Sequence, residues 1–267
     1  MRCLTLFAAV FFLQFCSRAD SIAVFYALDS DAGALKQNAR EAGQPISVGM
    51  RHIQRLAIGK HSVYAIKMGS GCVETALSAQ ALLSRFRCDW ALSIGPAGAL
   101  SDNLELGCWH RVAQVFAYQR GNGASRPMDA TWSADWARLP SSAVIDSLLY
   151  GASDLSVASG EAFIATTSDR DRLRATTGAA AVDMNSFGLV EACADHAVPL
   201  FIWRVISDRA DEHASVDFRT FATTYRGEGG AALAKWIAAL PANPSDPLAY
   251  PAIQEIMEDA GSNTVAE

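Results

Sequence analysis

A carboxylate at the end of an apolar run is the residue of this chain whose position most plainly permits chemistry. The stretch from Val198 to Asp211 reads VPLFIWRVISDRAD, and its apolar part stops at Ser207-Asp208-Arg209. We interpret the apolar part as a strand buried on both faces. Ligands of open α/β sheets bind beyond the carboxyl ends of strands, where a half-desolvated carboxylate can hold or donate a proton. Asp208 is therefore a candidate proton donor, and the capping of a following turn or helix is the alternative interpretation.

Two glycine-bearing segments stand where other predicted strands end. Gly69-Ser70-Gly71 separates an apolar run from a helical pattern, and Gly95-Pro96-Ala97-Gly98-Ala99 follows the apolar run 90–94. Glycines at such junctions let backbone N–H groups approach a ligand closely. The first segment is not a dinucleotide fingerprint, because Glu74 stands where the third glycine is required, and it lacks the Gly-Lys-Ser/Thr of a Walker loop. We expect the two segments to share one ligand crevice, with two ordinary tight turns as the alternative.

An acidic segment, Asp29-Ser30-Asp31-Ala32-Gly33, follows the first predicted core strand. Its acidic residues are suited to capping a helix that we expect to begin near Ala34. The first strand of such a fold is usually central, so we also expect this segment at the ligand edge of the sheet.

The elements that position these residues alternate between strands and helices, which indicates an α/β domain. Apolar runs predict strands over 22–28, 53–58, 62–68, 90–94, 111–118 and 198–206, the second and third forming a hairpin that turns at Gly59. Helical patterns cover 76–86, 168–174 (capped by Ser168), the segment after Ser186, and 231–240. In the irregular stretch 120–142, Trp132 and Trp136 either form a flap over the site or bury against the surface.

Composition narrows the possible partners. The chain has 267 residues, of which 51% are hydrophobic, enough for one large α/β domain with a substantial core. The formal net charge is −6 and no basic stripe is present, which argues against nucleic acid as a partner. The five histidines show no i,i+4 pairing and the cysteines no CxxC pattern, so we expect neither a metal centre nor a cofactor.

The first 19 residues have the pattern of a secretory signal peptide. Arg2 precedes an uncharged run from Cys3 to Ser17, and Ser17-Arg18-Ala19 is a small-x-small cleavage signal. The run is shorter than the roughly 20 residues of a membrane span; the alternatives are a buried first strand or a short anchor. We therefore expect an exported protein, periplasmic or secreted, without a stable membrane anchor after cleavage. The expected organisation is a signal peptide over 1–19, one domain over 20–240 and a C-terminal tail over 241–267.

Export also bears on the cysteines that cleavage would leave. Cys72, Cys88, Cys108 and Cys193 remain, and in an oxidising compartment they can form up to two disulfides with three possible pairings.

Taken in order, several strings resemble the nucleoside phosphorylase/nucleosidase family, above all the methylthioadenosine/S-adenosylhomocysteine nucleosidases. Their order and spacing agree from about Ile22 to Leu240. The resemblance implies a three-layer αβα sandwich around a mixed, partly closed central sheet, and a homo-oligomer (a dimer, trimer or hexamer), of which we favour the dimer. It also implies a purine nucleoside as the small-molecule substrate, cleaved at its N-glycosidic bond. The matching strings are Gly69-Ser70-Gly71, Gly95-Pro96-Ala97-Gly98, Gly160-Glu161-Ala162-Phe163-Ile164, Val182-Asp183-Met184-Asn185-Ser186 and Ile206-Ser207-Asp208-Arg209-Ala210-Asp211.

The resemblance also implies roles for individual residues. Phe163 would stack on the base, and the backbone of Ile164 would face the ring. Met184 would pack under the ribose. Asp208, steadied by Ser207, would protonate or hydrogen-bond purine N7, and a positioned acid of near-neutral pKa contributes roughly 10²–10⁴-fold. The glycine segments would contribute Gly71, Ala97 and Gly98 to substrate binding.

Two positions depart from the nucleosidase pattern. Asn185 stands where the nucleosidases have a Glu that holds the ribose hydroxyls, and an amide brings no negative charge to a cationic sugar. Ser30 stands where they have a water-activating Glu, although a shift of one residue would place Asp29 or Asp31 there.

These departures leave three functions open. A phosphorylase needs no water-activating base, but Ser93 occupies the place of its phosphate-clamping Arg, with Arg51 and Arg55 as conceivable substitutes. We therefore rank hydrolysis above phosphorolysis. The family also includes exported plant storage proteins, so a non-catalytic nucleoside-binding or storage protein is the alternative to a divergent nucleosidase.

Overall fold

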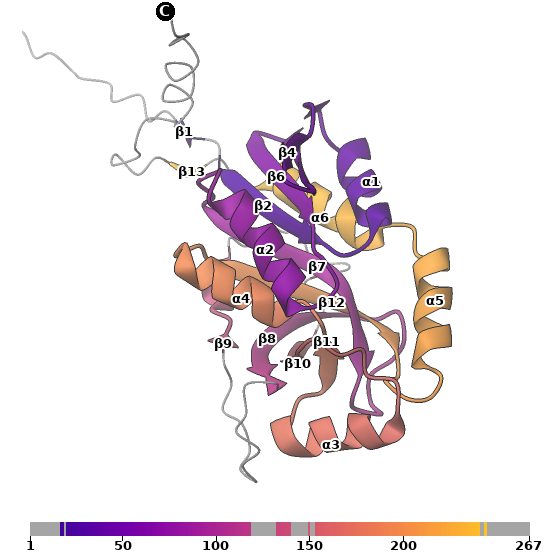
Figure 1. Cartoon of the computed structure of the whole chain (residues 1–267). Helices are drawn as coiled ribbons and strands as arrows, with labels where there is room; N and C mark the ends of the chain where they lie inside the picture. The colour runs from indigo at the N-terminus through magenta and orange to yellow at the C-terminus, as the bar shows by residue number, and fades with distance from the viewer. Residues whose placement is uncertain are drawn as a thin grey trace, which may run out of the picture. The chain divides into compact units, whose positions relative to one another are not determined.

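A mixed eleven-stranded sheet forms the centre of the fold (Figure 1). The computed structural model describes residues 17–18, 20–118, 132–139, 149, 153–240 and 243–244. The chain divides into two units, of which residues 19–241 hold this sheet. In the other unit, residues 1–18 and 242–267, strand β1 (Ser17–Arg18) pairs antiparallel with β13 (Asn243–Pro244). No helix among the described residues is long and apolar enough to cross a membrane.

Part of this sheet closes into a ring. Strand β7 (Trp90–Ala99) pairs in parallel with β12 (Leu200–Asp208), and β12 continues antiparallel to β8 (Trp109–Ala117). Parallel pairs then join β8 to β10 (Asp154–Ser159) and β10 to β11 (Ala181–Asp183). An antiparallel pairing of β11 with β7 completes the ring. The mixed, partly closed sheet expected from the resemblance is confirmed.

The rest of the sheet extends from the other side of β7. Strand β2 (Ser21–Tyr26) lies between β7 and β6 (His61–Lys67), parallel to both. The predicted hairpin is confirmed: β5 (Arg51–Ile58) pairs antiparallel with β6, and Gly59 takes a positive φ of 58° in the turn between them. Three short strands pair antiparallel at the margins: β3 (Glu41–Ala42) and β4 (Ile46–Val48) with β5, and β9 (Trp132–Ser133) with β8.

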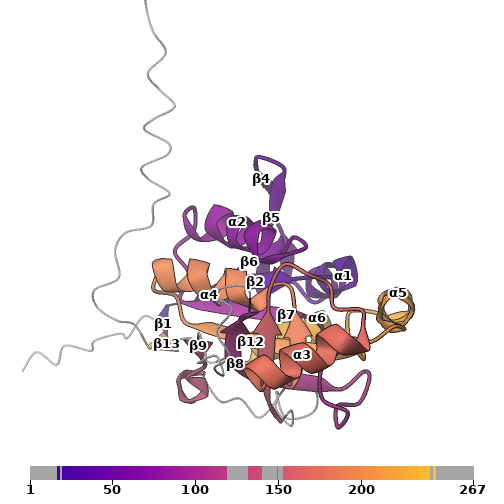
Figure 2. The ribbon, with the colours of Figure 1, turned by 60° about the horizontal axis from the view of Figure 1, so that its bottom comes forward.

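Helices cover both faces of the sheet and make the expected three layers. Helices α2 (Cys72–Leu83) and α4 (Ser186–Asp195) lie side by side on one face (Figures 1 and 2). Helices α1 (Asp29–Gln37) and α6 (Glu228–Ala239) pack together on the other. Side chains of β2 point alternately to the two faces of the sheet. Ala23 and Phe25 pack in the core under α2 and α4, whereas Ile22 and Val24 pack in the core under α1 and α6.

Two further helices lie at the ring end of the fold. Helix α3 (Thr167–Thr177) buries Leu173 against the neighbouring strands, and α5 (Ala214–Thr224) follows the loop after β12. The N-cap of α3 is Thr166, whose hydroxyl accepts a hydrogen bond from Asp169 N at 3.1 Å, so the prediction of Ser168 as the cap is wrong.

Local residue types misled the sequence-based prediction at two other places. The segment Gly95–Ala99 is not a turn, because β7 continues through it and pairs with β12 as far as Gly98 opposite Asp208. Helix α1 begins at Asp29 and not near Ala34, so the acidic segment forms its first turn.

The tryptophans and cysteines also have defined places. Trp136, in a 3₁₀ turn (η2, Trp136–Arg138), packs against Phe201 and Trp203 in the core, and Trp132 belongs to β9, so neither forms a flap. Most of the stretch 120–142 lies outside the described residues. The four described cysteines, Cys72, Cys88, Cys108 and Cys193, are all free thiols.

Candidate functional site

A cavity of about 690 Å³ lies at the carboxyl ends of the strands. Residues at or just beyond the ends of β2, β6, β7, β11 and β12 line it, together with the loop after β10 and part of α5. This is the edge at which the sequence predicts a ligand crevice. Most of the predicted site residues share this lining: Ala97, Gly98, Phe163, Ile164, Met184, Asn185, Ser207 and Asp208.

Asp208 is the last residue of β12 and is only 2% exposed. The Ser207 hydroxyl donates to its Oδ2 at 2.7 Å, and the backbone N–H of Ala210 donates to its Oδ1 at 3.0 Å. Burial raises the pKa of this carboxyl above its ordinary range, although the two donors oppose the shift; Asp217 and Asp211 add to the rise. A buried carboxyl that retains a proton at higher pH than usual is suited to proton donation into the cavity.

Gly98 leaves the space that the Asp208 carboxylate occupies. The two residues are register partners on β7 and β12. A Cβ added at Gly98 would lie 2.7 Å from Asp208 Oδ1 and 3.2 Å from Ala210 Cβ. The second glycine segment therefore has a packing reason for its residue type, which the interpretation as a turn did not supply.

Phe163 presents an aromatic ring at the cavity and is 43% exposed. Its ring lies edge-on to Phe218 of α5, with centroids 5.9 Å apart. The loop that carries it is fixed at Glu161, whose Oε1 accepts from Val73 N at 2.8 Å. The same carboxylate accounts for Gly71, which has a φ of 99° and whose added Cβ would lie 2.1 Å from Glu161 Oε2. Gly71 is thus not a lining residue but the point where two site loops meet.

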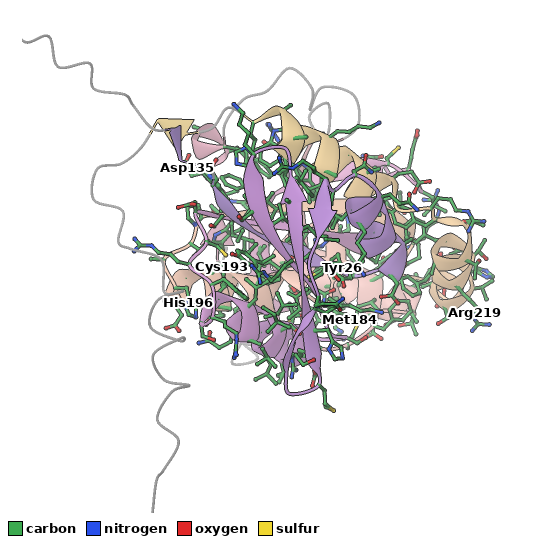
Figure 3. The ribbon with its side chains drawn as sticks, turned by 90° about the horizontal axis from the view of Figure 1, so that it is seen from above. Tyr26, Asp135, Met184, Cys193, His196 and Arg219 are labelled. Atoms are coloured by element: carbon green, nitrogen blue, oxygen red, sulfur yellow. The ribbon has the colours of Figure 1, made fainter. Side chains whose placement is uncertain are left out.

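Asn185 fixes the loop between β11 and α4, which also lines the cavity. Its Nδ2 donates to Gly69 O at 2.8 Å and to Thr75 Oγ1 at 2.6 Å. A carbonyl oxygen can only accept, so this contact sets the orientation of the amide. Both amide hydrogens are thereby used, and Oδ1 is the atom left for a ligand hydroxyl. Met184, the neighbouring lining residue, is half-buried and is labelled near the middle of the view in Figure 3, whereas Arg219 lies on α5 at the edge of that view.

A buried ion pair that sequence reasoning missed lies behind this loop. Arg204 Nε is 2.7 Å from Asp183 Oδ2, and the two side chains are 0% and 1% exposed. Arg204 also donates to Ser186 Oγ and Ser93 Oγ, both at 3.0 Å. Burial alone would raise the pKa of Asp183, but the Arg204 guanidinium and the hydroxyls of two serines hold it below its ordinary value. The pair ties β12 to the loop that presents Met184 and Asn185.

The acidic segment is divided between two environments. Asp29 is exposed and pairs with Lys67 Nζ at 2.8 Å, and Lys67 lines the cavity. Asp31 is 0% exposed and lies against α6, where its Oδ1 accepts from Tyr225 OH at 2.6 Å and Gly230 N at 2.9 Å. Burial raises the pKa of Asp31 to about 6. None of Asp29, Ser30 and Asp31 is a lining residue, so the structure does not bring the three candidate catalytic residues of this segment into the cavity.

The cationic candidates for phosphate binding lie elsewhere as well. Arg51 pairs with Glu74 at 2.7 Å and donates to Ser78 Oγ on α2. Neither Arg51 nor Arg55 lines the cavity. Ser93 is fully buried beside Arg204. Within the described parts of the chain, no cluster of three or more His, Cys, Asp or Glu side chains is arranged to hold a metal ion.

Comparison with known proteins gives consistent matches. The family model described as "Phosphorylase superfamily" matches residues 21–238. The 5'-methylthioadenosine/S-adenosylhomocysteine nucleosidase of Staphylococcus haemolyticus is 26% identical over 211 residues, covering 75% of this chain and 91% of the relative. That of Staphylococcus saprophyticus is 30% identical over 169 residues, covering 60% and 74%.

Two solved structures have the same fold. The 5'-methylthioadenosine/S-adenosylhomocysteine nucleosidase of S. pneumoniae, bound to the transition-state inhibitor MT-ImmA, superposes with a TM-score of 0.72 at 20% identity, covering 83% of this chain and all of the other. A mutant of futalosine hydrolase from Helicobacter pylori superposes with a TM-score of 0.73 at 18% identity and the same coverage.

Proposed function

This chain belongs to the phosphorylase superfamily, and on that premise we propose that it is a purine nucleosidase in which Asp208 acts at purine N7. The observation that carries the proposal is the position of Asp208. It is a buried carboxyl of raised pKa that lines the same cavity as the exposed ring of Phe163. A purine anion is a poor leaving group, and a proton delivered to N7 lets it leave as the neutral base. An aromatic ring holds a base by stacking, which is worth roughly 1–3 kcal/mol.

The proposed reaction separates leaving-group departure from water attack. The bond between the sugar C1 and the purine nitrogen breaks, its electron pair stays with the base, and the Asp208 proton passes to N7. The oxocarbenium-like sugar then forms a bond to the oxygen of water, which releases a proton to solvent, and Asp208 takes up a proton again. Asn185 Oδ1 supports this sequence as an acceptor for a ribose hydroxyl. The catalysis assigned to this chain therefore lies in protonation of the base and not in activation of water.

Hydrolysis is favoured over phosphorolysis by the state of two cations near the site, Arg204 and Lys67; a third cation, Arg219, lines the cavity from α5 and is the one that a phosphorylase would need to use. Ser93, at the position of the phosphate-binding Arg of the phosphorylases, accepts a hydrogen bond from Arg204. The Arg204 guanidinium is fully buried and neutralised by Asp183, so it offers no free charge to a phosphate dianion. Lys67 lines the cavity but is paired with Asp29.

We propose nucleosides of the methylthioadenosine/S-adenosylhomocysteine type as substrates. The first support for this proposal is that both staphylococcal relatives are named for these substrates. The cavity also extends from Asp208 to apolar side chains at the start of α1 and on α5, among them Leu28, Phe218 and Ala222. Such a surface suits an uncharged thioether on the 5' carbon of the ribose.

A binding protein of the same fold is the second candidate, and one observation favours it. The carboxylates that were candidates for activating water, Asp29 and Asp31, are both outside the cavity lining. A protein with Phe163, Met184 and Asp208 around a base, and no such carboxylate at the sugar, would bind a nucleoside or base without cleaving it.

We also propose export and self-association. The uncharged run after Arg2 supports a signal peptide over residues 1–19, and the first core strand of the folded unit begins soon afterwards, at Ser21. Two apolar side chains one helical turn apart on α2, Val73 and Leu77, are 62% and 49% exposed, which supports a homo-oligomer, with a dimer favoured. N-terminal sequencing of the exported protein and light scattering test these two proposals.

Release of free base from adenosine, inosine, methylthioadenosine and S-adenosylhomocysteine by residues 20–267 tests the function. Phosphate-independent release supports a nucleosidase, and release that requires phosphate would replace it with a phosphorylase. Saturable binding without turnover would instead favour the second candidate.

A further inference from the structure

Helix α5 forms one side of the cavity although it buries little surface of its own. It contributes five lining residues: Ser215, Phe218, Arg219, Ala222 and Thr223. Within the helix only Ala214, its first residue, is buried. Figures 1 and 2 show α5 at the margin of the folded unit, apart from the paired helices of either face. Apart from Phe221, which packs against the core, hydrophobic burial along the helix is limited, so contacts at its ends contribute to fixing its position.

The C-terminal end of α5 is anchored by Tyr225, whose ring packs in the core near Trp109 and whose hydroxyl bonds to a carboxylate oxygen. Tyr225 follows the helix directly, is 8% exposed, and stacks on Phe221 with centroids 5.1 Å apart. Its hydroxyl donates to Asp31 Oδ1 at 2.6 Å and accepts from Gly229 N at 2.8 Å. The same Asp31 oxygen accepts from Gly230 N at 2.9 Å.

These bonds also cap α6, whose own N-cap residue is Gly227 and has no side chain to do so. Asp31 satisfies the N–H of Gly230, and the Tyr225 hydroxyl satisfies that of Gly229. One carboxylate of α1 thus joins the end of α5 to the beginning of α6.

Close backbone packing leaves this junction no room to slide. A Cβ at Gly230 would lie 2.4 Å from the carbonyl oxygen of Asp31, and one at Gly227 would lie 2.3 Å from that of Ser30. Gly227 also has a φ of 86°, which favours glycine. The distance between α1 and the segment that follows α5 is therefore fixed by backbone contact on one side and by the Asp31 bonds on the other.

We propose that Asp31 is a positioning residue that holds α5 as a wall of the nucleoside cavity, through its hydrogen bonds and not through its charge. This inference rests on the proposed function only in taking a purine as the cavity's ligand. The proposal gives a positioning role to Asp31, which the sequence indicates as a candidate water-activating base. The two roles differ in what they require. A base needs an ionisable carboxylate, whereas a positioning residue needs only an oxygen that accepts from Tyr225 and Gly230.

The substitution Asp31→Asn separates these two requirements. The Oδ1 of the amide that it introduces can accept both existing bonds, and the NH₂ group would replace Oδ2, which has no hydrogen-bond partner in the described part of the chain. Asp31→Ala removes the acceptor altogether, and Tyr225→Phe removes only the hydroxyl, a gentler change should Asp31→Ala fail to fold. Asp195→Ala, at an exposed acid on α4, is the matched control.

Three measurements on the chain of residues 20–267 test the proposal: adenine binding by calorimetry, steady-state kinetics with methylthioadenosine, and hydrogen exchange of the α5 amides. Asp31→Asn and Asp195→Ala are expected to keep Kd for adenine and kcat within about threefold of the parent. Tyr225→Phe and Asp31→Ala each remove two buried hydrogen bonds at the end of α5 and are expected to weaken adenine binding roughly tenfold or more. Both should also speed exchange over Ala214–Thr224 and leave α2 unchanged.

Two results would overturn the proposal. A loss of kcat in Asp31→Asn with unchanged adenine binding would make Asp31 a base. Unchanged binding and exchange in both Asp31→Ala and Tyr225→Phe would remove its positioning role. If the parent chain binds no adenine, the proposed function fails, but the exchange rates still report whether Asp31 and Tyr225 hold α5.

Discussion

The guanidinium of Arg204 lies 2.7 Å from the carboxylate of Asp183, with both side chains out of contact with solvent. Arg204 stands four residues before Asp208 on β12, and Asp183 immediately precedes the loop residues Met184 and Asn185. The pair therefore fixes the proposed proton donor relative to the residues proposed to hold the sugar. We assign the pair a role in positioning these residues and only a small net contribution to the free energy of folding, because desolvation offsets much of the attraction between buried charges.

Breaking this pair is expected to be costly. Asp183→Asn would leave the Arg204 charge buried without its counterion, and such a loss typically costs about 3–5 kcal/mol. Urea denaturation at neutral pH measures the change. The control is Asp154→Asn, which removes the exposed partner of Arg111 and is expected to cost under about 1 kcal/mol. Equal effects of the two substitutions would contradict the role given to the buried pair.

The side-chain amide of Asn185 is expected to be required for stability, because only its NH₂ group can donate to the Gly69 carbonyl. Asn185→Asp would set a carboxylate oxygen against the Gly69 carbonyl that now accepts a hydrogen bond at 2.8 Å. Two acceptors cannot bond, so we expect a loss of about 1–3 kcal/mol in the free energy of unfolding at pH 7. Thermal denaturation at pH 7 and base-release assays measure the outcome. A stable variant with raised kcat would show instead that the site lacks only a negative charge.

Gly98 is expected to be intolerant of a methyl group. Gly98→Ala would place a Cβ 2.7 Å from Asp208 Oδ1, and the carboxylate or its strand must move. A displacement of the order of 1 Å at a reacting group can lower turnover about 100-fold. Gly33→Ala is the matched control, because its Cβ would meet nothing within 4 Å. Steady-state kinetics of both variants measure the effect. Turnover by Gly98→Ala equal to that of the parent would argue against Asp208 as the donor.

Asp31 is expected to make stability depend on pH. Its pKa rises from an ordinary 3.8 to about 6 on folding, so between these values the native state binds more protons than the unfolded state. The favourable contribution of the protonated form is complete below pH 3.8 and is lost as pH rises through 6, by about 3 kcal/mol at most. The groups that face it are Tyr225, which bonds to it, and Glu228, which raises its pKa further.

Asp31→Asn removes this titration. The variant should match the parent near pH 4 and become the more stable of the two between pH 5 and 7, as measured by urea denaturation across that range. A difference that does not change with pH would contradict the assignment.

The strand that ends at Asp208 could be predicted because an apolar run stops abruptly at a polar pair. The ion pair could not be predicted, because Asp183 and Arg204 are 21 residues apart and no spacing rule links them. One signal was present. Arg204 is the only charged residue in the run 198–206, and a charge inside a buried strand requires a partner.

The acidic segment shows why neighbours in sequence need not share a site. Because α1 begins at Asp29, Asp29 and Asp31 are two residues apart on a helix and point to different faces. One therefore reaches Lys67 at the cavity edge and the other reaches Tyr225 behind α5. The segment 95–99 differed from prediction for another reason: its pairing with β12 overrides the turn preference of its glycines and proline.

The central claim, that Asp208 protonates the departing base, is tested most directly by adenine release from methylthioadenosine in the parent chain and in Asp208→Asn across a pH series. Because burial raises the pKa of Asp208, we expect parent kcat to fall as pH rises through that pKa, since the acid must be protonated to donate. Asp208→Asn should lose roughly 10²–10⁴-fold in kcat and the pH dependence with it, while still binding adenine. Undiminished release by Asp208→Asn, with the same pH profile as the parent, would contradict the account.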